Sequence, residues 1–258
     1  MTDAKALPGA IEAAWGLRGR PTRGPKPLLS GPQIVAAAVR VAAAEGFGAV
    51  SMARVATELS TSAMSLYRHV ANKEELAVLM IEAVTTEPVA PRASDESWRP
   101  AAERYATGML AMFRANPWVL QVPISTPPAT PRQLAWLETG LAALDGTGLT
   151  EPEMMSAVLL VIGFVRNDAT LASQISAGAD AQGSSTDEVM SDYGALLRVL
   201  VQADRFPVLR RLVEAGVVDR PDDPDTEFQF GLTRILDGIA ALIDERAGSP
   251  VRGRSKNR

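Results

Sequence analysis

The 258 residues suffice for one large domain or two smaller ones, and 47% hydrophobic with 22% charged residues is the composition of an ordinary soluble globular protein. The absence of cysteine and the single histidine exclude disulfides, thiolate metal sites and metal sites with two histidines, and we expect no metal and no cofactor. The formal net charge is −4, and because no run of about 18 apolar residues occurs we expect a cytoplasmic protein without a membrane span.

The N-terminal part of the chain carries a local excess of basic residues. Between residues 18 and 73 there are eight lysines and arginines but only two acidic residues, so this stretch carries about +6 and the remainder about −10. Such a segment on an acidic body favours contact with a polyanion, although a solvated basic arm fits the charge equally well. Residues 1–29 also contain the sequence GRPTRGPKP, which breaks helices and predicts a flexible basic arm.

Helical patterns begin at Ser30. The sequence SGPQ is a capping box, in which Ser30 is the N-cap and Gln33 lies at the third helical position. The apolar positions that follow share one helical face as far as Gly46, which ends the helix. A second helix, of about two turns, begins after the N-cap Ser51. We take residues 30–87 as the first predicted domain.

Two further short helices belong to this domain. The polar stretch 60–62 separates the second helix from a third over 63–69, and Asn72 caps a fourth. Short helices joined by a tight turn form a helix-turn-helix pattern, in which the helix after the turn enters the major groove of DNA. We therefore predict that the helix over 63–69 binds double-stranded DNA.

This recognition helix offers small side chains and one long donor. Arg68 can bind the O6 and N7 atoms of guanine in a bidentate manner, whereas Met64 and Leu66 either face inward or touch a thymine methyl group. Donors at the end of this helix and at the start of the next are placed where phosphates would lie. The predicted DNA contacts are Ser51, Ser62, Ala63, Ser65, Tyr67, Arg68, His69 and Lys73.

Beyond the first domain the chain again shows only helical patterns. No segment alternates with period two, so we predict an all-α protein. Proline- and glycine-rich breakers separate the helices. The predicted helices cover residues 97–114, 117–124, 131–145, 151–177, 187–203, 205–215 and 224–246. We assign 97–246 to a larger second domain and 247–258 to a disordered basic tail.

An apolar and aromatic stripe runs through the first helices of the second domain. Its members are Tyr105, Met109, Met112, Phe113, Trp118 and Trp136. The stripe is typical either of solid core or of an adaptable small-molecule cavity. Arg166 and Asn167 lie on a long apolar helix, where a buried polar side chain needs a partner, either a ligand or an acidic residue of another helix. We include all eight as candidate ligand-binding residues.

The stretch SMARVATELSTSAMSLYRHVANKEEL resembles the signature of the TetR family of repressors. The spacing Leu-Tyr-x-His-x-x-x-Lys is complete as Leu66, Tyr67, His69 and Lys73. Members of the family usually have glycine at the turn between the second and third helices, where this chain has Ser60. A positive φ at Ser60, with slight strain, is therefore expected.

The resemblance continues more weakly over 97–246 and implies a two-fold dimer. The helix 151–177 is apolar all round, which predicts burial on every side, and the last helix has one broad apolar face from Phe228 to Leu242. Both helices would pair with their mates as a four-helix bundle; the alternative is that they fill the core of a monomer. A glutamate at Leu236 or Ile239 is expected to break the dimer.

Together these features predict a ligand-responsive dimeric transcriptional repressor. The N-terminal unit would bind a palindromic operator, and a small, apolar effector would release it by changing the spacing of the two recognition helices. A DNA-binding dimer without a small-molecule effector is the main alternative. An all-α enzyme is a further alternative. However, the sequence lacks a nucleophile elbow, a glycine-rich phosphate loop and a metal cluster, so no enzymatic activity is expected.

Overall fold

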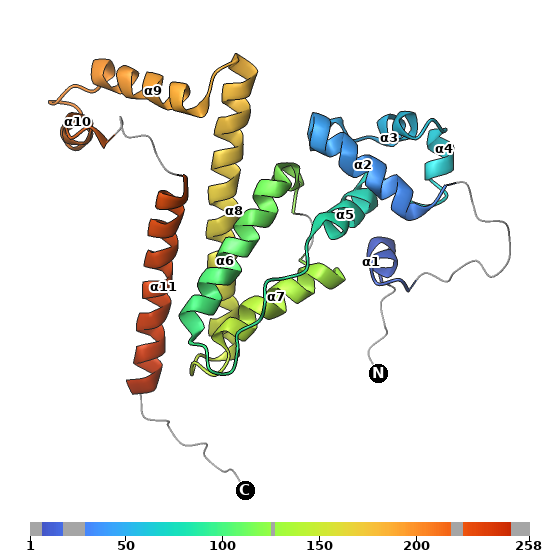
Figure 1. The fold of residues 1–258 in the computed structure, drawn as a ribbon, viewed down its shortest axis with the longest axis horizontal. Helices are drawn as coiled ribbons and strands as arrows, with labels where there is room; N and C mark the ends of the chain where they lie inside the picture. Colours follow the sequence, from blue (N-terminus) through green and yellow to red (C-terminus); the bar gives the residue numbers. More distant parts are fainter. Residues whose placement is uncertain (1–6, 18–28, 125–126, 218–223, 249–258) are drawn as a thin grey trace, which may run out of the picture.

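The computed structural model describes residues 7–17, 29–124, 127–217 and 224–248. Over these residues the protein is all-helical, as predicted. A small N-terminal unit lies on one side of a larger C-terminal helical domain, and an arm of two helices projects from the opposite side (Figure 1).

The N-terminal unit is built from short helices whose ends are capped locally. Its elements are α2 (Gly31–Glu45), η1 (Phe47–Ala49), α3 (Met52–Glu58), α4 (Ala63–Leu66) and α5 (Lys73–Val84). The predicted capping box is confirmed, since the Ser30 N–H donates to the Gln33 Oε1 at 2.9 Å. The side chains of Ser51 and Asn72 each accept a hydrogen bond from the backbone N–H three residues ahead, at 3.1 and 2.8 Å.

Two backbone turns shape this unit. Gly46 ends α2 with a φ of 80°, as expected, and Phe47 is buried directly after it. Ser60 has a φ of 50° and is the non-glycine residue with a positive φ within the described part of the chain, which confirms the expected positive φ. The third helix is shorter than predicted, because the His69 N–H bonds to the Leu66 carbonyl at 2.8 Å and tightens the chain into a turn.

The prediction of a flexible arm over residues 1–29 is wrong for its middle. Residues Gly9–Ala14 form a helix, α1, which packs against α5. Next to it, the Trp15 Nε1–H donates to the Ala129 carbonyl at 2.8 Å. A six-residue helix has no sustained apolar period, so only these tertiary contacts explain it. The basic residues between 18 and 28, and the predicted tail after 248, lie outside the described residues.

The C-terminal domain is a bundle packed around one long helix. Its elements are α6 (Trp98–Ala115), η2 (Pro117–Gln121), α7 (Pro131–Leu144), α8 (Glu151–Gln182), α9 (Thr186–Leu200), α10 (Pro207–Glu214) and α11 (Pro224–Gly248). Helices α6, α7 and α11 and the turn η2 all contact α8, whereas α9 and α10 form the projecting arm (Figure 1). The predicted helices are present, although α8 continues past the expected end at 177 to Gly183, whose φ of 68° terminates it.

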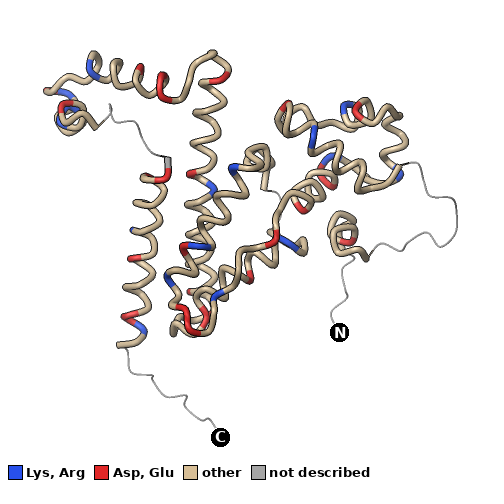
Figure 2. Tube along the Cα trace, viewed as in Figure 1, with Lys and Arg blue, Asp and Glu red and all other residues tan. Residues whose placement is uncertain are grey.

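Ion pairs hold α11 against its neighbours. Among the described side chains, three ion pairs join it to α6 and α8. They are Arg99 with Asp237 at 2.7 Å, Arg114 with Asp225 at 2.8 Å, and Arg246 with Glu153. Figure 2 marks the acidic and basic positions along these helices. These pairs lie at the start, middle and end of α11, so they fix its whole length on the bundle.

One prediction about α11 is wrong. Leu236 and Ile239 are not at a free surface: they are 0% and 5% exposed and belong to the core of their own chain. In the single chain Leu159, Leu160 and Leu171 of α8 are more than half exposed, so the predicted burial of α8 on every side would require a partner chain. The apolar face of α11 is used to cover α6 and α8, which leaves the outer face of α8 open.

Helix α8 is also long and apolar enough to cross a membrane when judged by length and composition alone. This is weak evidence, because core helices of soluble proteins have the same properties. Only 28% of its most apolar window is buried within the chain, but one side of it packs along α6, η2, α7 and α11. Such a packed helix is better explained as the centre of a bundle.

Candidate functional site

Helix α4 presents an outward face of small and long side chains. Met64 is 72% exposed, whereas Leu66 is completely buried, so the structure places Met64 outward and Leu66 in the core. Ser62 is the N-cap, and its Oγ lies 3.0 Å from the Oγ of Ser65. Arg68 is exposed in the turn that follows α4 and makes no ion pair with a described residue. The predicted base-contacting residues therefore share one accessible surface.

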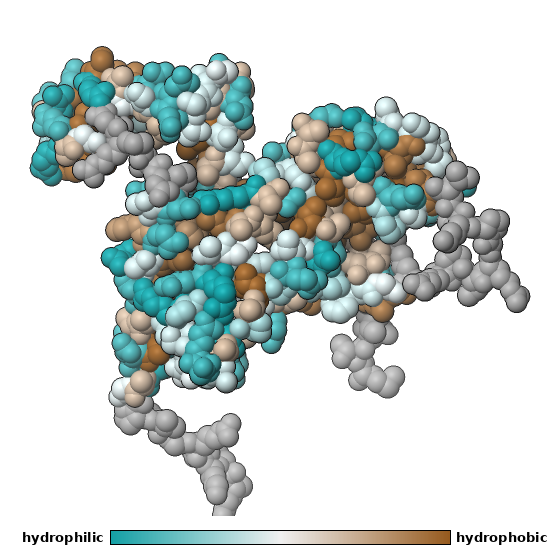
Figure 3. Space-filling view, in the orientation of Figure 1, coloured by the Kyte–Doolittle hydropathy of each residue, from teal (hydrophilic) through white to brown (hydrophobic). Residues whose placement is uncertain are grey.

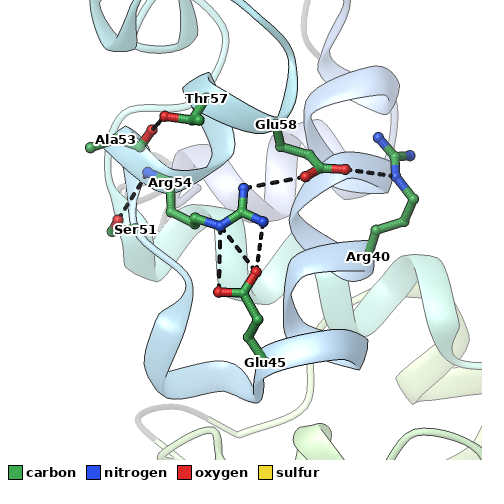
Figure 4. A network of polar contacts seen from close by, with 7 residues as sticks. All are labelled: Arg40, Glu45, Ser51, Ala53, Arg54, Thr57 and Glu58. Atoms are coloured by element: carbon green, nitrogen blue, oxygen red, sulfur yellow. Dashed lines mark hydrogen bonds and ion pairs between the residues drawn. The ribbon is translucent and has the colours of Figure 1, made fainter.

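A charge network holds α2 and α3 together (Figure 4). Arg54 donates to Glu45 at 2.6 Å and to Glu58 at 3.2 Å, and Glu58 also accepts from Arg40 at 3.3 Å. The bonds from Arg40 and then Arg54 lower the pKa of Glu58. The two arginines are thus neutralised within the unit, and the local positive charge available to a polyanion is smaller than the sequence count indicates.

The predicted phosphate-contacting residues lie around the start of α5. Lys73 is the first residue of this helix, and its Nζ lies 4.7 Å from the centre of the Phe47 ring. Tyr67 is half exposed, and His69 is partly buried beside it. Ser51 is exposed at the N-cap of α3. Cationic and hydroxyl hydrogen-bond donors near the end of α4 and the start of α5 form a surface that can bind anions.

The predicted ligand-binding stripe is filled core in this structure. Tyr105, Met109, Phe113, Trp118 and Trp136 are all buried, and Met112 packs against them. A cavity of about 10 Å³ beside Tyr105 has room for roughly one water molecule. The rings of Tyr105 and Trp136 lie 5.8 Å apart.

Polar atoms in this core lack partners. The Tyr105 hydroxyl and the Trp118 Nε1–H are buried and make no hydrogen bond with described atoms. Burial raises the pKa of the Tyr105 phenol, which keeps it protonated as a donor. Gly140 lies against the same ring, because a Cβ there would approach the Tyr105 Cζ to 2.8 Å. The sequence does not single out Gly140, since this close approach is a tertiary contact.

Arg166 and Asn167 have different surroundings. Arg166 is partly buried and donates to the carbonyls of Leu120 and Val122 at 3.3 and 3.5 Å. Its guanidinium lies 5.9 Å from the Phe113 ring, and burial lowers its pKa. The partners of Arg166 are therefore backbone carbonyls. They are neither a ligand nor an acidic residue of another helix, the two kinds of partner that the sequence suggested. Asn167 is exposed and does not join the other candidates.

The two parts of the chain meet at contacts that the sequence analysis did not anticipate. At the end of α5, the Arg132 guanidinium donates to the Thr85 carbonyl at 2.8 Å, and the Arg132 N–H donates to the Glu82 carboxylate at 3.2 Å. The Trp136 Nε1–H donates to the Thr86 carbonyl at 2.9 Å. The sequence shows an acidic residue near the end of one helix and an arginine in the first turn of another. It does not show that these two residues contact each other.

The chain matches known proteins over both parts. Residues 34–80 match the model of bacterial regulatory proteins of the tetR family, and residues 90–243 match that of the tetracyclin repressor-like C-terminal domain. The HTH-type transcriptional repressor DrrR1 of Streptomyces coeruleorubidus is 38% identical over 240 residues, which cover 92% of this chain and 87% of DrrR1.

Solved structures with a similar fold include two of ActR from Streptomyces coelicolor. The complex of ActR with actinorhodin has a TM-score of 0.71 and 29% identity, and the match covers 83% of this chain and 97% of ActR. The apo form has a TM-score of 0.70 and 28% identity, with 84% and 97% covered.

Proposed function

Because the chain belongs to the TetR family of bacterial regulatory proteins, we propose that it is a transcriptional repressor that binds a palindromic operator as a homodimer and is released by a small molecule. The family is one of DNA-binding regulators and not of enzymes, and such a protein acts in the cytoplasm, where the chromosome lies. Within this proposal, residues 30–87 bind DNA, and residues 97–246 carry the effector site and the dimer interface.

The observation that carries the proposal is the division of α4 into two faces. Leu66 anchors the helix in the core, while Ser62 and Ser65 present short side chains beside the long exposed side chains of Met64 and Arg68. Arg68 would read guanine in a bidentate manner, Met64 would touch a thymine methyl group, and the small Ala63 would permit close approach.

The phosphate contacts come from the residues that surround this helix. Lys73 and the free N–H groups of the first turn of α5 would hold one phosphate, because both the charge and the helix end favour an anion. Tyr67 and His69 would donate to the neighbouring phosphate. Ser51 accepts the Arg54 N–H in its capping role, and its own hydroxyl proton stays available to a phosphate oxygen.

A dimer would cover the open face of α8. An open groove of about 490 Å³ runs between α8 and α11, with Leu160 and Ile235 on its walls. Gly238 lies along its floor, where a Cβ would meet no other atom within 4 Å. Leu159 and Leu160 of α8 and Phe230 of α11 are more than half exposed. Burying this apolar surface against a second copy is favourable, and a two-fold pair would place two recognition helices on two half-sites.

The effector would enter the core beside Tyr105. ActR was solved with actinorhodin, which supports a small-molecule effector for this chain. The cavity is far below the roughly 300 Å³ of a typical ligand site, so binding would require side chains of the stripe to move apart. The unpartnered donors of Tyr105 and Trp118 would then bond to acceptors on a largely apolar ligand. The same small cavity favours the alternative of a DNA-binding dimer that has no effector.

The proposal is tested by selecting duplexes from a random pool on the purified chain. The selected sequences should form an inverted repeat, and binding should weaken steeply with salt. Sedimentation of the protein–DNA complex should give two chains for each duplex. Enrichment of no sequence, or a complex with one chain at saturation, contradicts the proposal.

A further inference from the structure

The N-terminal unit contacts the C-terminal domain at two places. At the end of α5, the Arg132 guanidinium donates to the Thr85 carbonyl at 2.8 Å, and the Arg132 N–H donates to the Glu82 carboxylate at 3.2 Å. At the turn after α2, where α2 and η1 pack against η2, the Phe47 N–H donates to the Gln121 Oε1 at 3.0 Å. The first contact contains charge-assisted bonds, whereas the polar bond of the second is a single neutral hydrogen bond, which is weaker.

The Gln121 amide closely fits the turn that it contacts. A Cβ at Gly46 would lie 3.3 Å from the Gln121 Oε1, so a side chain at this position would push the amide back by a few tenths of an ångström. Gly46 also has a φ of 80°, which favours glycine for a second reason. Phe47, the residue whose N–H is bound, carries the Lys73 ammonium over its ring at 4.7 Å. The position of Gln121 is therefore linked, through one residue, to a predicted phosphate contact.

On its other side Gln121 is held by α8. Arg166 donates to the carbonyls of Leu120 and Val122, the residues that flank Gln121, at 3.3 and 3.5 Å. These bonds are long, and the guanidinium is partly buried without a carboxylate among its described contacts. Any change that draws Arg166 toward a better partner would release the η2 backbone.

We infer that Gln121 is a positioning residue that transmits the state of α8 to the DNA-binding surface. Arg166 sets the position of η2, Gln121 passes that position to the turn at Gly46 and Phe47, and the turn places Lys73. Because α5 is pinned at its far end by Arg132, a shift of η2 tilts the unit instead of translating it. The inference rests on the proposed function only in using DNA affinity as one of its readouts.

The first test compares Gln121→Leu with Gln121→Glu in the full-length chain. The leucine removes the acceptor, whereas the glutamate keeps an oxygen for the Phe47 N–H and serves as the matched control. Hydrogen–deuterium exchange at Phe47 should become faster in the leucine variant alone. Binding to a duplex selected on the wild type should weaken by about 2- to 30-fold in the leucine variant, with an unchanged unfolding midpoint.

The second test asks whether Arg166 acts through Gln121. Arg166→Met should weaken DNA binding in the wild-type background but have little further effect in the Gln121→Leu background, whereas independent residues would give multiplied losses. Unchanged Phe47 exchange in the leucine variant, or fully multiplied losses, overturns the inference. If the wild type binds no duplex, the proposed function fails, and the exchange at Phe47 in Gln121→Leu and Arg166→Met still decides whether the contacts are coupled.

Discussion

Glu82 and Arg132 cap the ends of each other's helices. The Glu82 carboxylate accepts the N–H of Arg132 in the first turn of α7, at 3.2 Å, and the Arg132 guanidinium bonds to the last carbonyls of α5, at 2.8 Å for Thr85. Each helix end thus receives the charge that its dipole favours. The arrangement joins the two parts of the protein where the chain itself provides only an extended connection.

Arg132→Met should destabilise the protein. It leaves the carbonyls at the end of α5 without their guanidinium donor and the Glu87 carboxylate without the cation that lies 3.6 Å from it, and because the site is partly exposed we expect a loss of about 1–2 kcal/mol in the free energy of unfolding. Urea denaturation measures this loss. The matched control is Arg210→Met, whose ion pair with Glu214 lies within one exposed helix and should contribute less than about 0.5 kcal/mol. Equal losses in the two variants would contradict the capping role.

Lys73→Ala should weaken binding to all duplex sequences alike. A phosphate contact carries no sequence information, and removing one reduces the slope of log affinity against log salt by roughly 1. Binding isotherms at several salt concentrations, on a selected and on a scrambled duplex, measure both effects. A variant that loses affinity only for the selected duplex would make Lys73 a base contact instead.

Arg68→Ala should relax sequence preference at one position in each half-site. Loss of a bidentate contact to guanine removes about 1–3 kcal/mol of discrimination at that base pair and leaves other positions unaffected. Repeating the duplex selection with the variant shows which position becomes degenerate. If the selected sequence is unchanged and all duplexes bind more weakly, Arg68 is a phosphate contact.

Leu160→Glu should dissociate the dimer without unfolding the chain. Leu160 is 54% exposed on α8 and lines the groove, so a glutamate is solvated in the monomer but would be buried without a partner in the dimer. Val199→Glu, on the exposed arm, is the matched control and should stay dimeric. Sedimentation velocity separates the outcomes. Leu236→Glu should instead unfold the protein, because Leu236 is completely buried in its own chain.

Glu153 should contribute to acid sensitivity. Its bond with Arg246, followed by bonds from Thr150, lowers its pKa from 4.5 to about 2. A carboxyl group whose pKa is lowered by folding stabilises the native state above its unfolded pKa, and this stabilisation is lost as the pH falls from about 4.5 toward 2. Glu153→Gln should therefore flatten the decline of the unfolding midpoint in that window, whereas the exposed Glu138→Gln should not. Parallel pH profiles for wild type and Glu153→Gln would exclude this contribution.

Apolar surface on the projecting arm lies outside the predicted dimer interface. Tyr193, Leu196 and Val199 on α9 are at least half exposed, and Figure 3 shows apolar side chains at the surface of this arm. The dimer predicted from α8 and α11 does not by itself cover them. Exchange measurements on the Leu160→Glu variant would report whether α9 changes its protection when the dimer is lost.

The local sequence by itself determined most of the helices and the caps at which they begin, although not α1. The caps at Ser30, Ser51 and Asn72 and the strained turn at Ser60 depend on atoms within a few residues of each other, so their effects can be inferred without knowing the fold. The sequence of residues 51–76 also carries the resemblance to the TetR family, so the family could be identified before the fold was known. Features that depend only on neighbouring residues along the chain, such as helix caps and tight turns, were therefore predictable from the sequence.

Only the tertiary structure decided which residues become partners. Arg132 and Glu82 are 50 residues apart, Gln121 and Phe47 are 74 apart, and Trp15 reaches across 114 residues to Ala129. The same reason explains why the apolar face of α11 covers its own chain while the outer face of α8 stays open. Periodicity identifies an apolar face but not the surface that buries it, because that choice depends on how helices distant in sequence pack together.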